Sequence, residues 1–434
     1  MKSDSFGRYF GITTFGESHG PAIGVVLEDI KPGIEFPEEE IRKVLRERRP
    51  GKGQFSSERD ENDDLVILSG IFEGRTTGTP ICLIVFNHDH RPEDYNAIRN
   101  IFRPGHGDYC FYKKFKIYDY RGGGRASGRE TLARVAAGEM VNHLLGNIEI
   151  ALYPVQIGHF QANEVDLSFE NELHWPDRSN YQQLSTFLTD LKKQGDSCGG
   201  IIQAIIRNVP VGLGDPVFEK LDANLAKAIL SIGSVKGIEF GIGFQMADRK
   251  GSETNDEMSS GGFLSNNSGG ITAGISTGQE VRFRFLVKPT PSIRKTQNTM
   301  TTSGESIRFS VNGRHDTVII PRIIPVARAM IKLVLADAIS HQNLLTEKPA
   351  DLSILREVIE KIDEDLLLCL YRRKQISQNI GSLKKNQELP VSDPAREKEL
   401  FQQLQEKASE LDLDQDFVKE IWDRIFTYSR DLQC

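Results

Sequence analysis

Two patterns of apolar residues divide the chain near residue 350. Before that point, short apolar runs alternate with Gly and Pro, which is typical of short strands mixed with helices. Apolar runs predict strands at 23–27, 65–68, 81–86, 201–206 and 281–287, and helices are predicted at 37–45, 130–145, 181–193 and 221–230. Because strands seldom alternate one-to-one with helices, we expect a layered α+β fold and not a doubly wound parallel sheet.

Past residue 350, apolar residues recur every three or four positions, and no proline interrupts them from 351 to 389. A helix of that length exceeds the usual globular range and predicts a bundle or a coiled partner. Asp393-Pro394 has the form of an N-cap followed by a first helical proline, which predicts a second helix to about Ser409; a third begins at about Phe417. We therefore expect an α+β domain over 1–345, a polar join within 341–350, and an all-α three-helix domain over 351–434.

Composition excludes several classes of protein. The 434 residues carry 54 basic and 61 acidic side chains, and a net charge of -7 disfavours a nucleic-acid partner held by a global positive field. The only long uncharged stretch, 258–279, is rich in Gly, Ser and Asn, so no membrane span or membrane partner is expected. The N-terminal residues show neither a signal-peptide nor a transit pattern, and the 5 cysteines are widely spaced without a CxxC pair. These features predict a reduced, cytoplasmic protein.

Two histidines lie on glycine-rich turns. The segment GESHG (16–20) fits the G-x-S-x-G pattern, but a predicted strand follows it where a nucleophile elbow needs a helix. A turn between strands is therefore favoured, with His19 rigid and solvent-facing. The second histidine, His106, is flanked by a proline and two glycines within FRPGHGD (102–108). The run NHDH (87–90) offers no third metal ligand at an obvious spacing, so we interpret it as a solvated loop and expect no metal site.

The run RGGGRASGRE (121–130) predicts an anion site. Ser127 and Glu130 form a capping-box pattern at a helix start, and the glycines let a ligand approach the backbone closely. Exposed amides at a helix start favour an anion, most simply phosphate; a capped surface helix and an RGG-like RNA contact are the alternatives. With the two histidines for proton transfer, a polyanion site would also draw on a basic turn and two polar loops, namely 46–53, 288–292 and 313–316.

Four motifs closely resemble chorismate synthase, and they follow the family's order over residues 6–340: GESHGPAIGVVLEDIKPGI, FRPGHGDY, YRGGGRASGRETLARVAAGEM and GRHD. The resemblance implies loss of phosphate and a proton from 5-enolpyruvylshikimate 3-phosphate to give chorismate. It also implies reduced FMN as the cofactor, with NADPH as one candidate reductant. His19 and His106 would be an acid/base pair, one serving the leaving phosphate and one the flavin. Asp316 would help to take the substrate proton through the flavin.

The same resemblance implies binding residues. Expected FMN contacts are Arg125, Ala126, Ser127, Gly233, Ser234, Ala273, Lys288, Pro289, Thr290, Pro291, Ser292 and Arg314. Expected substrate-side arginines are Arg48, Arg103, Arg129 and Arg134. Two positions depart from the family pattern. Gln54 stands where the family usually has Arg, so one anion contact is expected to be missing, and Ala126 replaces a usual Ser, which matters little if the backbone makes that contact.

The tail, from about 352 to 433, resembles the all-helical class of chorismate mutase, which rearranges chorismate to prephenate without a cofactor. The resemblance implies catalytic Lys384, Glu397 and Gln433, and substrate-binding Arg356, Arg373, Asp393, Arg396 and Ser429. Arginine forks suit the two carboxylates of chorismate, and Lys384 and Gln433 can donate to its ether oxygen. Arg356 and Arg373 are 17 residues apart, hence about 25 Å along one helix, which is too far for one chorismate. In this family two chains interlock and share each site, which resolves the conflict.

The leading hypothesis is thus a bifunctional enzyme whose first domain makes chorismate and whose second consumes it. Its partners would be 5-enolpyruvylshikimate 3-phosphate, chorismate and further copies of the chain, with a homotetramer carrying two intertwined mutase dimers. The alternative is a chorismate synthase whose helical domain is a non-catalytic module that senses chorismate or prephenate, or that dimerises the enzyme.

Overall fold

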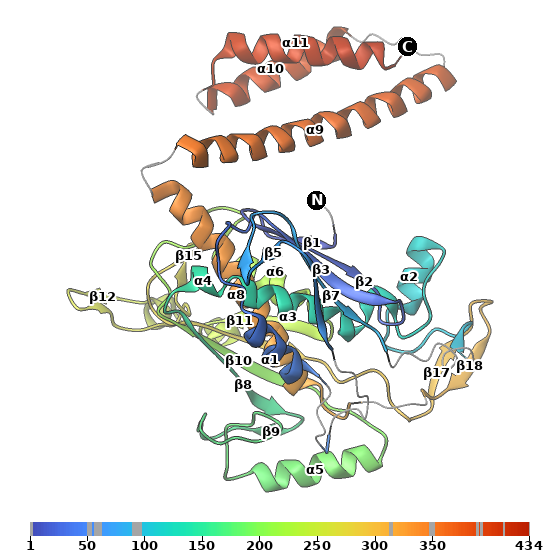
Figure 1. Cartoon of the computed structure of the whole chain (residues 1–434), viewed down its shortest axis with the longest axis vertical. Coiled ribbons are helices and arrows are strands. Elements are labelled where there is room, and N and C mark those ends of the chain that lie inside the picture. The colour runs from blue at the N-terminus through green and yellow to red at the C-terminus, as the bar shows by residue number, and fades with distance from the viewer. Residues whose placement is uncertain are drawn as a thin grey trace. The chain divides into compact units, whose positions relative to one another are not determined.

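The structure is a computed structural model that describes residues 3–49, 54–55, 63–88, 98–311, 316–346, 352–387, 390, 394–410 and 413–433. The chain divides into two compact units, Met1–Thr346 and Glu347–Cys434. The first unit mixes strands and helices in layers and the second is all helical, which confirms the predicted fold classes (Figure 1).

Two five-stranded sheets, with antiparallel pairing throughout, form the frame of the first unit. The first sheet has the order β1 (Ser5–Phe6), β2 (Gly11–Gly16), β3 (Ala22–Glu28), β7 (Ile81–Phe86) and β4 (Leu65–Ser69). The second has the order β11 (Val235–Phe240), β16 (Val281–Val287), β10 (Gly200–Arg207), β8 (Glu149–Ile157) and β9 (Phe160–Gln161). In β10 and β16 alternate side chains are buried, so each strand turns one face to the core.

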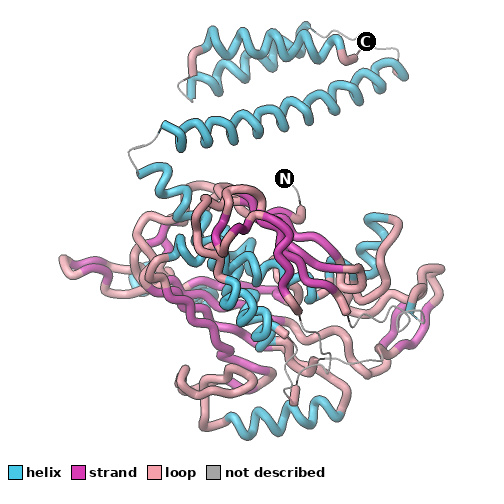
Figure 2. Tube along the Cα trace, viewed as in Figure 1, coloured by secondary structure: helices cyan, strands magenta, loops and turns pink. Residues whose placement is uncertain are grey.

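Helices fill the space between the two sheets (Figure 2). α3 (Thr131–Met140) packs on β2 and β3 of the first sheet, α8 (Ile320–Thr346) packs on β8 and β10 of the second, and the two helices pack on each other. Small residues allow this contact, since a Cβ on Gly138 would lie 2.6 Å from Cβ of Ala329. The buried side chains of both sheets and these helices form one continuous core.

The other elements of the first unit are shorter or lie at its surface. The helices are α1 (Glu38–Arg48), α2 (Asp108–Phe115), α4 (Asn142–Leu145), α5 (Tyr181–Lys193), α6 (Leu221–Leu230) and α7 (Gly251–Thr254). The two-stranded ribbons are β5 (Ile71–Phe72) with β6 (Arg75–Thr76), β12 (Met258–Ser259) with β13 (Gly262–Phe263), β14 (Ile271–Thr272) with β15 (Ile275–Ser276), and β17 (Gln297–Met300) with β18 (Ser306–Phe309).

All five predicted strands and all four predicted helices of this unit are present, with ends that differ by a few residues. α8 was not predicted. It carries Pro325 inside the helix and apolar residues on nearly every side, so it lacks a one-faced pattern. It also continues to Thr346, so the part of the predicted polar join before residue 347 is helical.

The second unit consists of α9 (Leu352–Asn386), α10 (Pro394–Glu410) and α11 (Gln415–Asp431), which agrees with the predicted helices. Asp414 caps α11 by accepting a hydrogen bond from the backbone N–H of Phe417 at 2.8 Å. α11 contacts both α9 and α10. Much of the apolar stripe on α9 remains exposed, including Leu366 at 57 % and Ile376 at 58 %.

Candidate functional site

The GESHG segment is a turn between antiparallel strands. β2 ends at Gly16 and β3 begins at Ala22, so no helix follows Ser18 and a nucleophile elbow is excluded. The prediction of a solvent-facing His19 is wrong, because the residue is only 6 % exposed. Gly122 covers the imidazole so closely that a Cβ there would lie 2.2 Å from the ring. Ser18 Oγ lies 2.9 Å from Nδ1 of His19, so a buried hydroxyl holds the ring.

The three glycines of the RGGGRAS run form the lid over this turn. Gly122, Gly123 and Gly124 have φ values of 64°, 88° and 53°, a backbone region that favours glycine. Asp119 holds this lid at both sides: it accepts two hydrogen bonds from the guanidinium of Arg121, at 2.8 and 3.0 Å, and it shares a hydrogen bond with Glu17 of the GESHG turn. Burial and this contact with Asp119 raise the pKa of Glu17.

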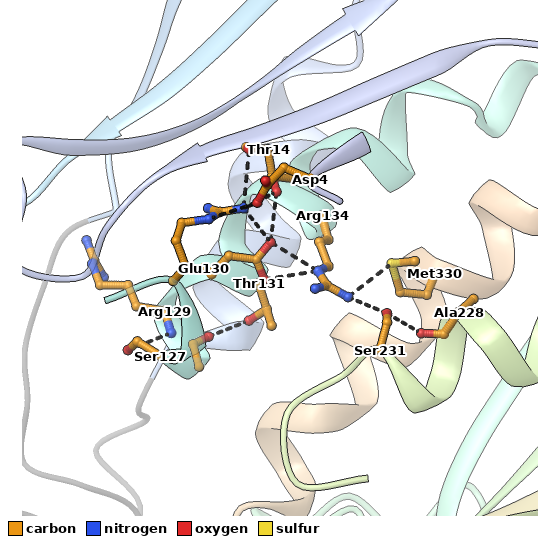
Figure 3. Close-up of polar contacts among 12 residues, drawn as sticks. Asp4, Thr14, Ser127, Arg129, Glu130, Thr131, Arg134, Ala228, Ser231 and Met330 are labelled. Atoms are coloured by element: carbon orange, nitrogen blue, oxygen red, sulfur yellow. Dashed lines mark hydrogen bonds and ion pairs between the residues drawn. The ribbon is translucent and has the colours of Figure 1, made fainter. Parts of the chain in front are cut away.

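Ser127 and Glu130 do not form the predicted capping box. Ser127 accepts a hydrogen bond of 3.4 Å from the backbone N–H of Arg129, at the start of a short 3-10 turn that precedes α3. Glu130 turns away from this end: its carboxylate accepts hydrogen bonds of 3.0 Å from Thr14 Oγ1 and from Arg134 Nε (Figure 3). The prediction is wrong for Glu130 because its carboxylate binds these two side-chain donors, one of them from β2, and not the backbone N–H that a capping box requires.

Arg125 and Arg134 are both committed to contacts within the protein. Arg125 braces the glycine run against β2, donating to Thr14 Oγ1 at 2.7 Å and to the carbonyl of Gly16 at 3.1 Å; it also forms an ion pair of 2.9 Å with Asp4. Besides its contact with Glu130, Arg134 donates a hydrogen bond of 2.6 Å to Ser231 Oγ, just after the end of α6 (Figure 3).

A buried carboxylate joins two of the predicted substrate arginines. Asp63 accepts a hydrogen bond of 3.1 Å from Arg48 Nη2 on one oxygen and one of 2.8 Å from Arg129 Nη1 on the other. Burial alone would raise the pKa of Asp63, but the two guanidinium groups hold it below its usual value. Burial lowers the pKa of Arg48 to about 10.

Asn87 completes this cluster. Its Oδ1 accepts a hydrogen bond of 2.6 Å from Arg129 Nε, and its Nδ2 donates to the carbonyls of Glu17 and Gly20. Asn87 is 5 % exposed, so the interpretation of 87–90 as a solvated loop is wrong at its first residue; 89–90 lie outside the described residues. The predicted basic turn at 46–53 is likewise helical through Arg48, and 50–53 are not described.

Three buried arginine nitrogens point to an anionic ligand. The Nε atoms of Arg48, Arg49 and Arg322 make no hydrogen bond within the described part of the chain. Arg322, near the start of α8, donates through Nη1 to Asp316 at 2.6 Å, and its charge contributes to the low pKa of Arg48, so Arg48 and Arg322 lie close together. A buried donor without an acceptor costs about 1–3 kcal/mol, which the oxygens of a bound anion would offset.

His106 joins two loops that are far apart in the sequence. Its Nδ1 lies 3.0 Å from the carbonyl of Pro104 and its Nε2 lies 2.9 Å from Ser292 Oγ. The carbonyl can only accept, so Nδ1 carries the proton and Nε2 accepts from the serine hydroxyl. Burial, with the nearby charge of Arg103, lowers the pKa of His106 to about 4, so the ring is neutral at pH 7.

The loop that carries His106 is held from both sides. Arg103 forms a bidentate buried pair with Asp108, with both hydrogen bonds at 2.7 Å, so this predicted substrate arginine shapes its own loop. Lys288 Nζ donates to the carbonyl of Gly105 at 2.9 Å, and Pro291 packs so closely that a Cβ on Gly105 would lie 2.8 Å away. The predicted flavin loop 288–292 therefore lies directly against the histidine loop.

A cavity of about 60 Å³ connects this region with Asp316. Its lining includes Ser292 and Asp316 together with Lys192, Asp196 and Arg294. In the same loop, Thr290 Oγ1 is buried without a hydrogen-bond partner among the described residues.

The remaining predicted flavin contacts do not all converge. Ser234, beside Gly233, accepts a hydrogen bond of 2.8 Å from the backbone N–H of Lys288 and so lies at the flavin loop. Ala273 lies near the N-terminal end of α6, because the carbonyl of its neighbour Gly274 accepts a hydrogen bond from Leu221, the first residue of that helix. Ser234 instead follows the C-terminal end of α6. A helix of 10 residues separates the two ends by about 15 Å. Arg314 lies outside the described residues.

Gln54, the position that departs from the family pattern, faces α5. Its Nε2 donates to Thr189 Oγ1 at 3.1 Å, its backbone N–H donates to Glu172 at 2.9 Å, and its carbonyl accepts from Lys192 at 2.6 Å. Gln54 thus connects its loop to α5 through hydrogen bonds at the surface.

In the second unit, α9 and α11 bring several predicted mutase residues together. Arg373 donates to Ser429 Oγ and lies 5.7 Å from the ring centre of Phe426. Gln433 lies against α9, beside Gly381. Two other predicted residues pair locally: Glu397 accepts from Arg430 at 2.6 Å and Arg396 contacts Glu399.

Lys384 follows Gly381 by three residues on α9 and therefore lies on the same side of that helix. Arg356 is exposed on the distant N-terminal half of α9, so these contacts do not include it. Asp393 lies outside the described residues.

The patterns in the sequence missed several residues of these sites. Asp63 stands in an acidic run before β4 with no motif of its own, and Arg322 lies in the unpredicted helix α8. Ser18 acts through a hydrogen bond and Gly381 through close packing, and spacing along the chain reveals neither. Among the described residues no cluster of His, Cys, Asp and Glu could hold a metal ion, and no helix has the length and hydropathy that a bilayer span requires.

Comparison with known families divides the chain at the same place. A family model described as chorismate synthase matches residues 10–340, and one described as chorismate mutase type II matches residues 355–434.

Similar whole proteins cover the first unit. A chorismate synthase of Syntrophus aciditrophicus (strain SB) is 47% identical over 80% of this chain and 100% of its own length. One of Syntrophobacter fumaroxidans (strain DSM 10017 / MPOB) is 48% identical over 79% of this chain and 98% of its own length. A crystal structure of chorismate synthase superposes with a TM-score of 0.58 at 30% identity, covering 77% of this chain and 92% of that one.

Proposed function

Since the chain belongs to the chorismate synthase family and carries a chorismate mutase type II domain behind it, we propose that its first unit makes chorismate from 5-enolpyruvylshikimate 3-phosphate with reduced FMN, and that its second unit converts this chorismate to prephenate. The chain combines a lyase and an isomerase. The observation that carries the proposal for the first unit is the pair of buried Nε atoms without acceptors on Arg48 and Arg322, two neighbouring cations of which the second contacts Asp316. An anionic substrate supplies those acceptors.

The residues around the loop 288–292 fit a flavin. Thr290 Oγ1 is a buried polar atom that a ligand could satisfy, and the Ser292–His106 pair lies beside it. FMN would contact this loop, Ser234 and the backbone of the RGGGRAS run, since the side chain of Arg125 is already committed to β2. When bound in its reduced form, the flavin supplies electron density to the allylic system as phosphate departs. NADPH is the electron donor that we propose for it.

Two histidines move protons in the proposed elimination. His106 is neutral at pH 7 and accepts a hydrogen bond at Nε2, so this nitrogen can take a proton on the flavin side. His19 is buried under the glycine lid and held by Ser18, so it can give a proton to the leaving phosphate from a fixed position. Arg48 and Arg129, bridged by Asp63, offer positive charge to that phosphate.

Asp316 is the proposed acceptor of the substrate proton. Its carboxylate is 7 % exposed and lines the cavity shared with Ser292, on the flavin loop. Arg322 donates to one oxygen, which orients the carboxylate, while the buried Nε of Arg322 has no acceptor among the described residues. We propose that Arg322 positions Asp316 through this hydrogen bond.

The second unit rearranges chorismate by electrostatic means. Arg373 and Arg396 bind carboxylates, while Lys384 and Gln433 donate to the ether oxygen as negative charge develops on it. Glu397 accepts from the hydroxyl group of the substrate, and Ser429 orients Arg373. Asp393 joins the binding set.

We propose that two chains interlock to complete each mutase site. The exposed apolar side chains of α9 are unsuited to water over such a length, and a second copy of the helix would cover them. Arg356 would then enter the site of the neighbouring chain, which removes the conflict of about 25 Å along one helix. Complementation tests this: Arg356→Ala and Arg373→Ala chains, each inactive as mutases, regain activity when they are unfolded and refolded together.

A larger oligomer would also explain Ala273. If this residue contacts flavin, it contacts the flavin of a neighbouring copy, since it lies at the end of α6 opposite to Ser234. A tetramer of the first units with two mutase dimers satisfies both requirements. The widely spaced, odd-numbered cysteines remain our reason for proposing a cytoplasmic location.

One experiment tests both activities. Purified protein is mixed anaerobically with 5-enolpyruvylshikimate 3-phosphate and chemically reduced FMN, and chorismate and prephenate are followed together. The proposal expects chorismate to appear first and prephenate after it. Prephenate formation from added chorismate at only the uncatalysed rate would instead favour a sensing or dimerising role for the second unit. Replacing the chemical reductant by NADPH tests the source of electrons.

A further inference from the structure

The contact between α9 and α11 is a narrow seam that carries part of the proposed mutase site. On α9, Arg373, Ser377 and Gly381 follow one another at four-residue steps and so share one face. Ser377 and Gly381 are buried. On the other side lie Ser429, which accepts from Arg373, and Gln433. The seam thus begins at an arginine and ends at the glutamine.

Gly381 is the point of closest approach. A Cβ built there would lie 2.7 Å from Cα of Gln433, 3.0 Å from its carbonyl oxygen and 3.3 Å from its carbonyl carbon. All three atoms are backbone, so no side-chain rotation could relieve the overlap. Glycine within a helix costs about 1 kcal/mol relative to alanine, and Gly381 has an ordinary helical backbone. Close approach is therefore the reason for glycine at this position.

The approach fixes the place of the Gln433 side chain. Gln433 lies just past the end of α11, in a turn closed by hydrogen bonds from its own N–H to Arg430 and from Leu432 to Tyr428. Its Oε1 is buried and has no hydrogen-bond partner among the described residues. The backbone of Gln433 is thus seated against α9 at a level one helical turn from Lys384, and the described residues leave the amide oxygen of its side chain without a donor.

We propose that Gly381 is a positioning residue for the mutase reaction: the absence of a Cβ lets the backbone of Gln433 lie against α9, where the amide can act together with Lys384. This inference rests on the proposed mutase function of the second unit. Any larger residue pushes the last turn away from α9 while Lys384 stays in place. The pair of donors then no longer converges on one ether oxygen.

The test is a double-mutant cycle in the full-length protein, with added chorismate as substrate and wild-type mutase activity measured first. Gly381→Ala is expected to lower kcat/KM roughly 10- to 100-fold, mainly through kcat, because a displacement near 1 Å has effects of this order. In the Gln433→Ala background the same substitution should change kcat/KM less than about twofold, since the group that it displaces is gone. Ser382→Ala, at the exposed neighbouring position, is the matched control and should leave activity unchanged.

A stability cycle covers the case in which Gly381→Ala disturbs folding. A chain that ends at Leu432 has no backbone for the new Cβ to meet, so there Gly381→Ala should raise the thermal midpoint of the second unit, whereas in the full chain it should lower it. Equal losses of activity in both backgrounds, or equal shifts of the midpoint with and without Gln433, would overturn the proposal. Absence of mutase activity in the wild type would instead contradict the proposed function itself.

Discussion

The two units hold their reactive side chains in opposite ways. In the first, His19, Arg48 and Asp316 are buried in the core of their own chain, and each is held by another side chain. In the second, Lys384 stands on α9, whose apolar residues are largely exposed. The layered core of two sheets and several helices buries Arg48 almost completely, whereas the three helices of one chain bury Arg373 only in part. Under the function proposed above, the first site therefore depends mostly on its own fold, and the second depends on a second copy of the chain.

Charging the apolar face of α9 should have the largest effect and should separate the units most clearly. Leu366→Glu would bury an unpaired carboxylate in the proposed dimer contact. We expect mutase activity to fall by at least about 100-fold, since such burial costs several kcal/mol, while the synthase activity per chain is retained. Analytical ultracentrifugation and separate assays measure both. Glu364→Gln, on the same exposed helix, is the control; full mutase activity in Leu366→Glu would contradict the shared-site proposal.

Removing His106 should have the opposite selectivity. His106→Ala deletes a proton acceptor on the flavin side, and such groups contribute roughly 10²- to 10⁴-fold. We expect chorismate formation to fall by that factor, while prephenate formation from added chorismate is unchanged. Parallel loss of both activities would show that the units do not function separately.

The buried carboxylate between Arg48 and Arg129 offers a test of stability within the first unit. Asp63→Asn removes a negative charge that the two guanidinium groups share, and loss of one partner of a buried pair costs about 3–5 kcal/mol. We expect the free energy of unfolding of the first unit to fall by that amount. Hydrogen exchange of the amides in β10 and β16 reports it; a decrease below about 1 kcal/mol would mean that water reaches the cluster.

The same unit should lose stability in acid because of His106. Its pKa is lowered from 6.5 to about 4. Between these two pH values the imidazole is protonated in the unfolded chain but stays neutral in the folded chain. The contribution is complete above pH 6.5 and is lost as the pH falls through about 4. Unfolding of the first unit, followed between pH 7 and pH 4, should show a smaller decline in His106→Asn than in the wild type. Parallel profiles would contradict a buried neutral imidazole.

The smallest effect is expected at Gln54. Because its side chain faces α5 at the surface, Gln54→Arg should gain at most a contact with Glu172. We expect KM for 5-enolpyruvylshikimate 3-phosphate to change less than about fivefold, as is usual for exposed ion pairs. Thr189→Val removes the same surface hydrogen bond and serves as the comparison. A strong gain in affinity for the arginine variant would place this loop at the substrate.

Helices and strands were predictable wherever apolar residues recur with a local period or form a short run. The stripe that predicts α9 and the apolar runs that predict β7 and β16 depend on local periodicity, which the chain carries in its order. α8 escaped prediction because its apolar residues surround it and because Pro325 looks like a helix breaker. A central helix packed on all sides has no polar face to reveal its period.

The sequence by itself determined the two-part organisation, the classes of both units and the motifs that point to a bound anion and to chorismate chemistry, since these depend on periodicity and on residue type along the chain. Only the tertiary structure decided which arginines are committed: Arg125 to β2, Arg103 to Asp108, and Arg48 to Asp63. It also decided that His19 is buried and that Gly381 faces Gln433. Partners that are far apart in the sequence meet only through packing. Burial, and not residue type alone, sets the pKa of His106. Burial likewise decides which arginine nitrogens lack water and therefore require an acceptor from a ligand.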